Sequence, residues 1–305
     1  MLECHRQFRN STIFAGGAWK WSGFGAHNAF SLKSANMQLD VCAEYGVDRV
    51  IVTSWGDNGG EASQFSSMAS LLYYAERCYG VRTDSEWMNR RAWQCFGTSF
   101  DTLLAFDLPD RLPETDASVA GRPKNPSKYL LYNDLLERLM GCHLNRETAP
   151  GLYMEHASRL EELAGDPAFG YAFDTLSKLC RVVSLKCDMG WRLYQAYGAG
   201  DRTALAGIAN REIPVLLTAA EEFLAAFRRQ WYLENKTFGF VAHEIRLGGL
   251  MERIRSVGSR LNVYLNGEID EIEELSLAPL PMSADSDGAY ICYHNWHNIV
   301  AAGIL

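Results

Sequence analysis

The pattern of apolar and polar positions predicts two short β-strands near the start of the chain. Residues 11–15 form a β-prone run that ends at Gly16 and Gly17, and residues 49–55 form a second, apolar run. A continuous apolar run is typical of a parallel strand that is covered on both faces. We therefore expect two parallel strands, the second of them buried on both sides.

A helical pattern follows each of these strands. The first predicted helix has Ser31 as its cap and ends at Gly46, and the second covers residues 61–80 after a loop over residues 56–60. Apolar residues recur at helical spacing in both, and the two stripes consist of Leu32, Ala35, Leu39 and Cys42, then of Phe65, Met68, Leu72 and Ala75. The order strand, helix, strand, helix is the repeating unit of an α/β fold.

Beyond residue 80 the strand signal nearly disappears and helices dominate. Residues 84–106 are helical in pattern around Trp87, Trp93 and Phe96, and residues 107–128 form a connecting loop rich in Pro, Asp and Lys. Long amphipathic helices are predicted over residues 153–164, 169–197, 213–231 and 245–264. The chain therefore divides into an α/β part and a larger helical part.

Composition narrows the class of protein. The 305 residues contain 29 Lys and Arg against 37 Asp and Glu, so the formal net charge is −8. A dedicated nucleic-acid binder is usually basic, so we expect no nucleic-acid partner. No apolar run is long enough to cross a bilayer and the N-terminus lacks the features of a signal peptide, so we expect no membrane association and a cytoplasmic location.

The cysteines and histidines give no sign of a metal site. The eight cysteines include no CxxC pair and no Cys beside a His at zinc-ligand spacing, and most fall at apolar positions of helical patterns. We predict reduced, buried thiols at Cys4, Cys42, Cys78, Cys95, Cys142, Cys180, Cys187 and Cys292. His294 and His297 lack further ligands in sequence, which favours a structural role. We expect neither metal nor cofactor.

Candidate chemistry gathers directly after the two predicted strands. Trp19 and Trp21 follow the first strand, and Trp55, Asp57 and Glu61 follow or end the second. In an α/β barrel the loops after the strands build the active site. An indole face covers the apolar face of a sugar ring, and carboxylates accept hydrogen bonds from hydroxyls. The same spacing also allows a structural alternative, in which the tryptophans plug a barrel and Asp57 caps the next helix.

Two other chemistries are not favoured. Neither Gly-rich stretch has the GxxxxGK[ST] pattern of a phosphate loop, and Asp57 would repel a phosphate in the second. A nucleophilic triad is also unsupported, because the chain has no GxSxG motif.

Five blocks of sequence match a known pattern. Two of them, Phe14-Ala-Gly-Gly-Ala-Trp-Lys-Trp-Ser-Gly-Phe24 and Thr53-Ser-Trp-Gly-Asp-Asn-Gly-Gly-Glu61, resemble the last two strands of the barrel in glycoside hydrolase family 20. Residues 125–134, 231–236 and 245–250 are similar to the helical C-terminal domain of its bacterial exo-β-N-acetylhexosaminidases. The resemblance implies an α/β barrel fragment, the last two strand–helix units of a TIM-type barrel, over residues 1–82. A mainly α-helical domain, expected to form a homodimer, follows over residues 83–305.

The resemblance also implies an activity. The family hydrolyses terminal β-linked N-acetylglucosamine or N-acetylgalactosamine with retention, using the substrate's own acetamido oxygen as nucleophile. An Asp orients the acetamide and the adjacent Glu protonates the leaving oxygen, and this pair follows the fourth barrel strand of the family. The one Asp-Glu dipeptide here, Asp270-Glu271, lies in the acidic stretch 268–274, which we predict to be a solvated helix face. We therefore expect the catalytic pair to be missing and this chain alone to be inactive.

The resemblance assigns sugar-binding roles residue by residue. Trp55 matches the wall of the acetamido pocket, Asp57 matches the acid that holds the outer hydroxyls, and at least one of Trp19 and Trp21 should face the sugar. Glu61 is either a second hydroxyl acceptor or an acid in the first turn of a helix. Tyr132, Asn133 and Asp134 either reach the site or pack a helix start. The alternative from another class is a non-catalytic helical interaction protein that retains a remnant sugar-binding edge.

Overall fold

The chain divides into two compact units. The computed structural model describes residues 2–5, 7–8, 10–80, 82–113, 124–138 and 144–279. Unit 1 comprises Met1–Leu108 with Asp166–Ala168, and unit 2 comprises Pro109–Gly165 with Phe169–Leu305. Unit 1, as its internal contacts define it, therefore extends beyond the domain boundary between residues 82 and 83 that we expect from the sequence. That boundary stays a prediction about the domains of the family.

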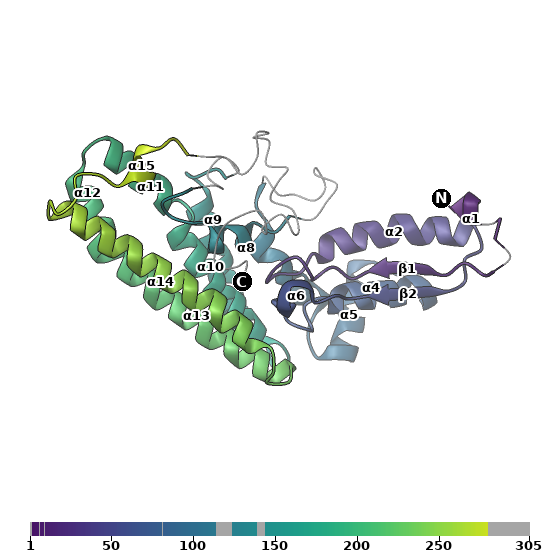
Figure 1. Cartoon of the computed structure of the whole chain (residues 1–305). Coiled ribbons are helices and arrows are strands. Elements are labelled where there is room, and N and C mark those ends of the chain that lie inside the picture. Colours follow the sequence, from purple (N-terminus) through teal and green to yellow (C-terminus); the bar gives the residue numbers. More distant parts are fainter. Residues whose placement is uncertain are drawn as a thin grey trace. The chain divides into compact units, whose positions relative to one another are not determined.

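Unit 1 contains a two-stranded parallel sheet (Figure 1). Strand β1 is Phe14–Gly17 and strand β2 is Val50–Thr53, with Phe14 opposite Val50 and Gly17 opposite Thr53. Gly16 and Gly17 therefore belong to β1, although the sequence suggested that they end it. The reason is close packing: a Cβ on Gly16 would lie 2.6 Å from the Tyr74 hydroxyl oxygen. Only glycine leaves room for this tyrosine against the strand.

The expectation that the second strand is buried on both faces is wrong. Ile51, in the centre of β2, is 54 % exposed. Strand β1 covers one edge of β2, and the described part of unit 1 contains no further strand. An apolar run thus marks β2 correctly as a strand, but the elements that surround it leave one side open.

Helix α2, Asn28–Glu44, begins earlier than the pattern predicts, with His27 rather than Ser31 at the cap position. Ser31 is not its cap, because the Ser31 hydroxyl donates to the His27 carbonyl inside the first turn. The free N–H groups at the start of the helix instead donate to the carboxylate of Asp107. Ala35, Leu39 and Cys42 are buried as predicted. The helix ends before Gly46, which has φ +68°.

The other helices of unit 1 are α1 (Leu2–His5), α3 (Asp57–Gly60), α4 (Met68–Tyr79), α5 (Ser85–Phe96), α6 (Phe100–Leu104) and the 3₁₀-helix η1 (Ala105–Asp110). Of these, α1 and α3 are not predicted from the sequence, α3 lying in the predicted loop over residues 56–60, and the rest are shorter than predicted. The helix predicted over residues 61–80 starts only at Met68, because serine-stabilised turns occupy the residues before it. Phe65 and Ala75 are exposed, so the predicted stripe is only partly correct. The helix predicted over residues 84–106 breaks at Gly97, which has φ +72°.

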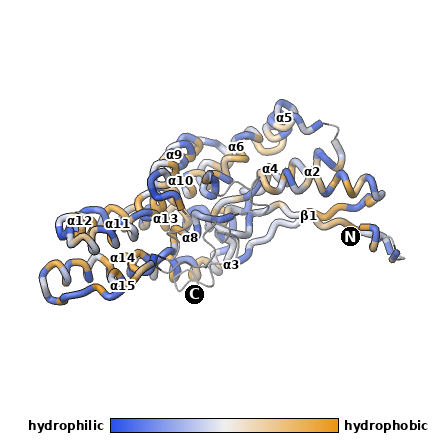
Figure 2. Tube along the Cα trace, turned by 90° about the horizontal axis from the view of Figure 1, so that it is seen from above, coloured by the Kyte–Doolittle hydropathy of each residue, from blue (hydrophilic) through white to orange (hydrophobic). Residues whose placement is uncertain are grey.

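Unit 2 is a bundle of helices (Figure 1). They are α8 (Pro126–Tyr132), α9 (Ala149–Leu163), α10 (Gly170–Lys186), α11 (Met189–Gly198), α12 (Arg202–Gly207), the π-helix η4 (Ile208–Glu212), α13 (Ile213–Glu234), α14 (Phe240–Leu265) and α15 (Glu273–Ser276). Helices α13 and α14 lie side by side and share an aromatic core in which Phe223 and Phe227 stack. Hydrophilic and hydrophobic positions alternate along these helices (Figure 2), as amphipathic packing requires.

Three expectations for this unit need correction. The helix predicted over residues 169–197 is two helices, α10 and α11, which meet at Cys187 and Asp188. The predicted loop over residues 107–128 contains the end of η1 and the start of α8. The acidic stretch 268–274 is not a helix face, because helix begins only at Glu273. The residues before it are irregular, and among them Ile272 is buried and its N–H donates to the Tyr197 hydroxyl.

The cysteines are less uniformly buried than predicted. The six in the described residues are free thiols, and of these Cys42 and Cys180 are buried. Cys4, Cys78 and Cys95 are exposed, because they occupy outward positions of short helices. Cys142, Cys292, His294 and His297 lie outside the described residues.

The architecture agrees with the coarse expectation of a mainly helical chain. Two parallel strands and many helices make up the described residues, which fits a helical C-terminal domain. Among the helices that the structure describes, none combines the length and apolar composition that a bilayer span needs.

Candidate functional site

The two predicted clusters leave the sheet of unit 1 at the same edge. Because β1 and β2 are parallel and Gly17 lies opposite Thr53, their carboxyl ends coincide. The Ala18 N–H donates to the Thr53 carbonyl at 2.8 Å and continues the pairing by one residue. The segment that carries Trp19 and Trp21 and the segment that carries Trp55 and Asp57 therefore start next to each other.

Trp19 and Trp21 form an aromatic pair. Their ring centroids are 4.3 Å apart with an interplanar angle of 32°, and Trp19 also forms an edge-type contact with Phe30, with ring centroids 5.0 Å apart. A Cβ on Gly17 would lie 2.9 Å from Trp21 and 3.0 Å from Nε1 of Trp19, so this glycine leaves room for the pair. Both side chains are half-buried. Each therefore keeps part of its surface open at the strand ends.

Trp55 and Asp57 are the exposed members of the candidate site. Trp55 is 58 % exposed, so its indole is not part of the core of unit 1. Asp57 is the first residue of the short helix α3, and Gly56 occupies the cap position. Asn58 and Gly59 adopt left-handed conformations with φ 56° and 99°, which turns the chain sharply after Asp57. This turn keeps the Asp57 carboxylate at the surface.

Glu61 is buried, with 3 % of its surface exposed. It follows α3 directly and precedes α4 by several residues, so the interpretation that it belongs to the first turn of the next helix is wrong. The reason is the turn that its neighbours Ser63 and Ser66 form before Met68. Its assignment as a hydroxyl acceptor stays a prediction.

Tyr132, Asn133 and Asp134 lie in unit 2, at the end of α8. Arg253 donates to the Asp134 carboxylate through Nε at 2.6 Å and Nη2 at 3.2 Å, and the N–H groups of Leu136 and Glu137 donate to the same group. Burial raises the pKa of Asp134, but these hydrogen bonds and the Arg253 charge outweigh it and lower the pKa. Asp134 is therefore held as a charged junction between α8 and α14.

A buried lysine completes this junction. Lys186 donates to the carbonyl oxygens of Leu130, at 3.0 Å, and Asn133. Burial lowers its pKa to about 8, although the Asp134 charge acts in the opposite direction. The cavity between Tyr132, Asp134 and Lys186 has a volume of only about 30 Å³. That volume suits a water molecule rather than a sugar ring, so within unit 2 these residues pack a helix end.

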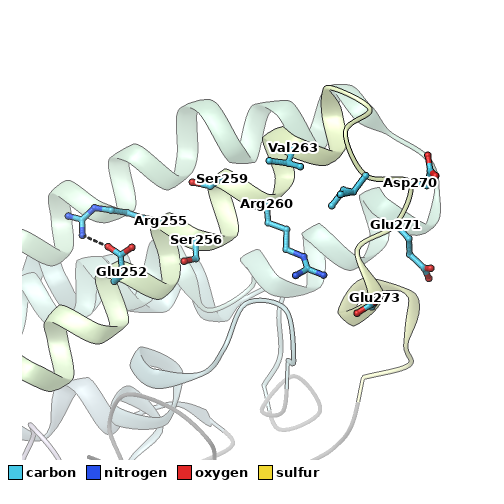
Figure 3. A pocket seen from close by; sticks show the side chains of 10 residues that line it. Glu252, Arg255, Ser256, Ser259, Arg260, Val263, Asp270, Glu271 and Glu273 are labelled. Carbon is cyan, nitrogen blue, oxygen red and sulfur yellow. Dashed lines mark ion pairs between the residues drawn. The ribbon is translucent and has the colours of Figure 1, made fainter.

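The Asp270-Glu271 dipeptide lies at a larger cavity in unit 2 (Figure 3). This cavity of about 760 Å³ opens between α14 and the segment before α15, and its lining contains no aromatic residue: it consists of Glu252, Arg255, Ser256, Ser259, Arg260, Val263, Ile269, Asp270, Glu271 and Glu273. The two arginines pair with glutamates, Arg255 with Glu221 and Arg260 with Glu274. Without a strand end or an aromatic wall, this dipeptide does not resemble the catalytic pair of family 20.

Sequence reasoning missed the residues that hold the strand-end segments. Asn28 and Asp107 are both buried and hydrogen-bonded to each other, with Asn28 Nδ2 to Asp107 Oδ1 at 3.0 Å. His27, beside them, is buried, and burial lowers its pKa to about 4. No local pattern signals a contact between residues 79 positions apart. The sequence offered one signal, which is the polar side chain of Asn28 beside the apolar residues at the start of α2.

The fold and the comparisons together define the class of protein, which is the helical C-terminal part of a glycoside hydrolase. Residues 101–292 match the family model described as Glycoside Hydrolase 20C C-terminal domain, and the chain belongs to this family. The sequence resemblance to the C-terminal part of a family 20 enzyme is thereby confirmed. Among curated proteins, the comparison finds no match.

Proposed function

We propose that this chain is the C-terminal part of a β-N-acetylhexosaminidase that removes terminal β-linked N-acetylglucosamine or N-acetylgalactosamine. The observation that carries the proposal is the family match, which covers most of the helical region. The strand-end position of the tryptophans and carboxylates supports it, because active sites of α/β barrels gather at the carboxyl ends of strands. In this proposal β1 and β2 are the last two strands of the catalytic barrel.

The proposed mechanism divides the work between this chain and a barrel segment outside these 305 residues. That segment supplies the Asp-Glu pair, which polarises the acetamido group and protonates the leaving oxygen. This chain supplies binding: the open indole of Trp55 walls the acetamido pocket, and the carboxylate of Asp57 accepts hydrogen bonds from the outer hydroxyls. Trp19 or Trp21 covers a face of the sugar, and no cofactor takes part.

A second candidate is a non-catalytic interaction protein, and one surface favours it. Five large apolar side chains are more than half exposed around the turn between α13 and α14: Tyr232, Leu233, Phe238, Val241 and Ile245. Exposed apolar groups of this size often mark contacts between proteins. The same surface supports the proposal that the helical domain forms a homodimer. A dimer does not exclude the enzyme, so activity decides between the two functions.

The deciding experiment combines this chain with a barrel segment that carries the Asp-Glu pair. Hydrolysis of a nitrophenyl β-N-acetylglucosaminide is measured for each component alone and for both together. We expect no turnover by this chain alone, because it lacks both the acid and the acetamide-orienting group. We expect turnover when both are present. Turnover by this chain alone, or none by the pair when both are folded, contradicts the proposal.

Matched variants test the assigned residues. Trp55→Ala should lower kcat/KM by about tenfold or more, because a stacked indole is lost. Its control is Trp93→Ala, since Trp93 is 65 % exposed but lies on α5. Asp57→Asn should lower kcat/KM by about tenfold, because hydrogen bonds to a charged acceptor become neutral ones. Asp48→Asn is its control, at the opposite end of β2. Equal effects in variant and control would refute the assignments.

A further inference from the structure

We propose that Asn28 is a positioning residue, which joins the two segments that carry the candidate sugar-binding tryptophans. Asn28 is the first residue of α2 and is fully buried, with 0 % of its surface exposed. Its side chain forms hydrogen bonds with Asp107, Ser66 and Ser70, none of which belongs to the sheet or to the tryptophan pair. Its importance lies in what its amide group connects. For enzymatic activity this inference rests on the proposed function, whereas its structural consequence does not.

The amide of Asn28 uses its full hydrogen-bonding capacity. Nδ2 donates to Asp107 Oδ1 at 3.0 Å and to the Ser66 carbonyl at 2.9 Å. Oδ1 accepts from the Ser70 hydroxyl at 2.7 Å and from the Ser70 N–H at 3.3 Å. A primary amide has two donor hydrogens and one oxygen that accepts two bonds, so no capacity remains. Since a carboxylate only accepts, the contact with Asp107 also fixes which way the amide faces.

Asp107 fixes the start of α2 in the same place. Its Oδ1 accepts from the Asn28 N–H and its Oδ2 from the Ala29 N–H, both at 2.8 Å. Only 3 % of Asp107 is exposed. A carboxylate is favourable at a helix N-terminus because it faces the positive end of the helix dipole. The buried pair therefore determines where the first turn of α2 lies.

The first turn of α2 holds the segment after β1. The Trp19 N–H donates to the Ser31 hydroxyl at 2.9 Å, and the Trp19 carbonyl accepts from the His27 N–H at 2.9 Å. The Ala26 N–H donates to the Phe106 carbonyl, next to Asp107, at 3.0 Å. Both backbone groups of Trp19 are thus bonded to the turn that Asn28 and Asp107 fix. A shift of this turn moves Trp19.

A second set of hydrogen bonds connects the Asn28 side chain to the segment after β2. Ser66, whose carbonyl accepts from Asn28, closes a turn with the Ser63 carbonyl at 2.8 Å. The neighbouring Ser67 exchanges a hydrogen bond of 3.0 Å with Ser54, the residue before Trp55. Asn28 therefore connects the base of the Trp55 segment to the base of the Trp19 segment. A buried network that is fully satisfied specifies one arrangement of its parts.

Asn28→Asp is the sharpest variant because it keeps the size of the side chain and reverses the contact with Asp107. The new carboxylate faces the Asp107 carboxylate at the former hydrogen-bond distance, and like charges that close repel. When the pH falls, one proton shared between the two carboxylates restores a donor. We therefore expect KM to rise on the order of 10-fold to 100-fold near pH 7, with a smaller change in kcat. The KM should recover partly toward pH 5.

Three further variants separate positioning from general loss of structure. Asn36→Asp makes the same change on an exposed position of α2, where Asn36 accepts from the Tyr73 hydroxyl, and should leave KM unchanged. Asn28→Asp combined with Asp107→Asn removes the repulsion between two carboxylates, but the new amide group also faces backbone N–H groups at the start of α2, so this variant should restore the KM only in part. Asn28→Ser removes the amide group without adding a charge. It should therefore raise KM, and this increase should not become smaller at lower pH.

A measurement on the chain alone tests the structural part without any enzyme activity. Two indoles 4.3 Å apart give a coupled circular dichroism signal that depends on their mutual orientation. Asn28→Asp should weaken this signal while the helical signal stays, and Asn36→Asp should change neither. If the wild-type chain and the barrel segment together show no turnover, the proposed function fails, and the circular dichroism measurement still decides the inference about Asn28. An unchanged indole signal together with an unchanged KM in folded Asn28→Asp overturns it.

Discussion

The buried residues under the strand ends of unit 1 and those between α13 and α14 of unit 2 differ in their chemistry. In unit 1 the residues under the strand ends are polar and nearly fully buried: Asn28, Ser31, Ser63, Ser66, Ser67, Ser70 and Asp107. In unit 2 the interior between α13 and α14 is mainly aromatic and aliphatic, and the ring of Phe227 contacts those of Phe223 and Phe240. Apolar burial is strong but non-directional, whereas hydrogen bonds are directional. We infer that the apolar core of α13 and α14 stabilises unit 2, whereas the polar network of unit 1 holds side chains in defined positions.

The largest expected effect tests the apolar interior of unit 2. Phe223 is 0 % exposed and stacks on Phe227 with ring centroids 5.9 Å apart. Phe223→Ala should lower the free energy of unfolding by about 3–5 kcal/mol, because it removes a buried ring and leaves a cavity. Urea unfolding followed by the helical signal measures the loss. The control is Val215→Ala, which is 55 % exposed on the same helix and should change stability by less than about 0.5 kcal/mol. Similar losses for both would break the comparison.

Hydrogen exchange gives the next largest effect and compares the two units directly. Amides of β1 and β2 belong to a two-stranded sheet with an exposed Ile51, and such small sheets are only marginally stable. Amides in the buried turns of α13 open only with the helical core. We expect exchange at residues 14–17 and 50–53 to be about 100-fold faster or more than at residues 216–227. Equally slow exchange in both regions would contradict this, and would also weaken the proposal that the strands belong to a larger barrel.

The fold was predictable where the deciding forces are local. The periodicity of α13 and α14 identifies them within a few residues, because each helix buries one continuous stripe along its own length. The start of α2 was not predictable, because its cap is Asp107, far along the chain. Gly16 and Gly17 look like a strand end, yet they are strand residues, because Tyr74 and the tryptophan pair occupy the space beside them. In each case a distant side chain overrides the local pattern.

The candidate site shows the same division. Parallel strands place their carboxyl ends together, so the sequence alone brought Trp19, Trp21, Trp55 and Asp57 to one edge. Asn28 carries no such signal, because its role depends on three partners from two segments that lie far along the chain. Residues that contact a ligand are often recognisable from their type and position. Residues that position them are visible only once the partners are known.

The smallest expected effect concerns the ion pair between Asp134 and Arg253 in unit 2. The pKa of Asp134 is lowered by Arg253 and backbone donors in the folded chain, against the opposing effect of burial. Its unfolded pKa is the ordinary value of about 3.9, so the unfolded chain binds the proton more readily as the pH falls. The stabilisation is therefore present above this value and is lost as the pH falls through the lower, folded pKa.

Asp134→Asn removes this dependence. We expect it to cost on the order of 1 kcal/mol at neutral pH, because Arg253 is partly exposed and solvent screens the pair. At the lowest pH at which both proteins are still folded, wild type and Asp134→Asn should approach the same free energy of unfolding. Urea midpoints measured from neutral to acidic pH give the difference curve. The control is Glu161→Gln in the exposed pair with Arg181, which should change stability little at any pH. A difference between wild type and Asp134→Asn that stays constant with pH would show that Asp134 acts through its backbone hydrogen bonds and not through its charge.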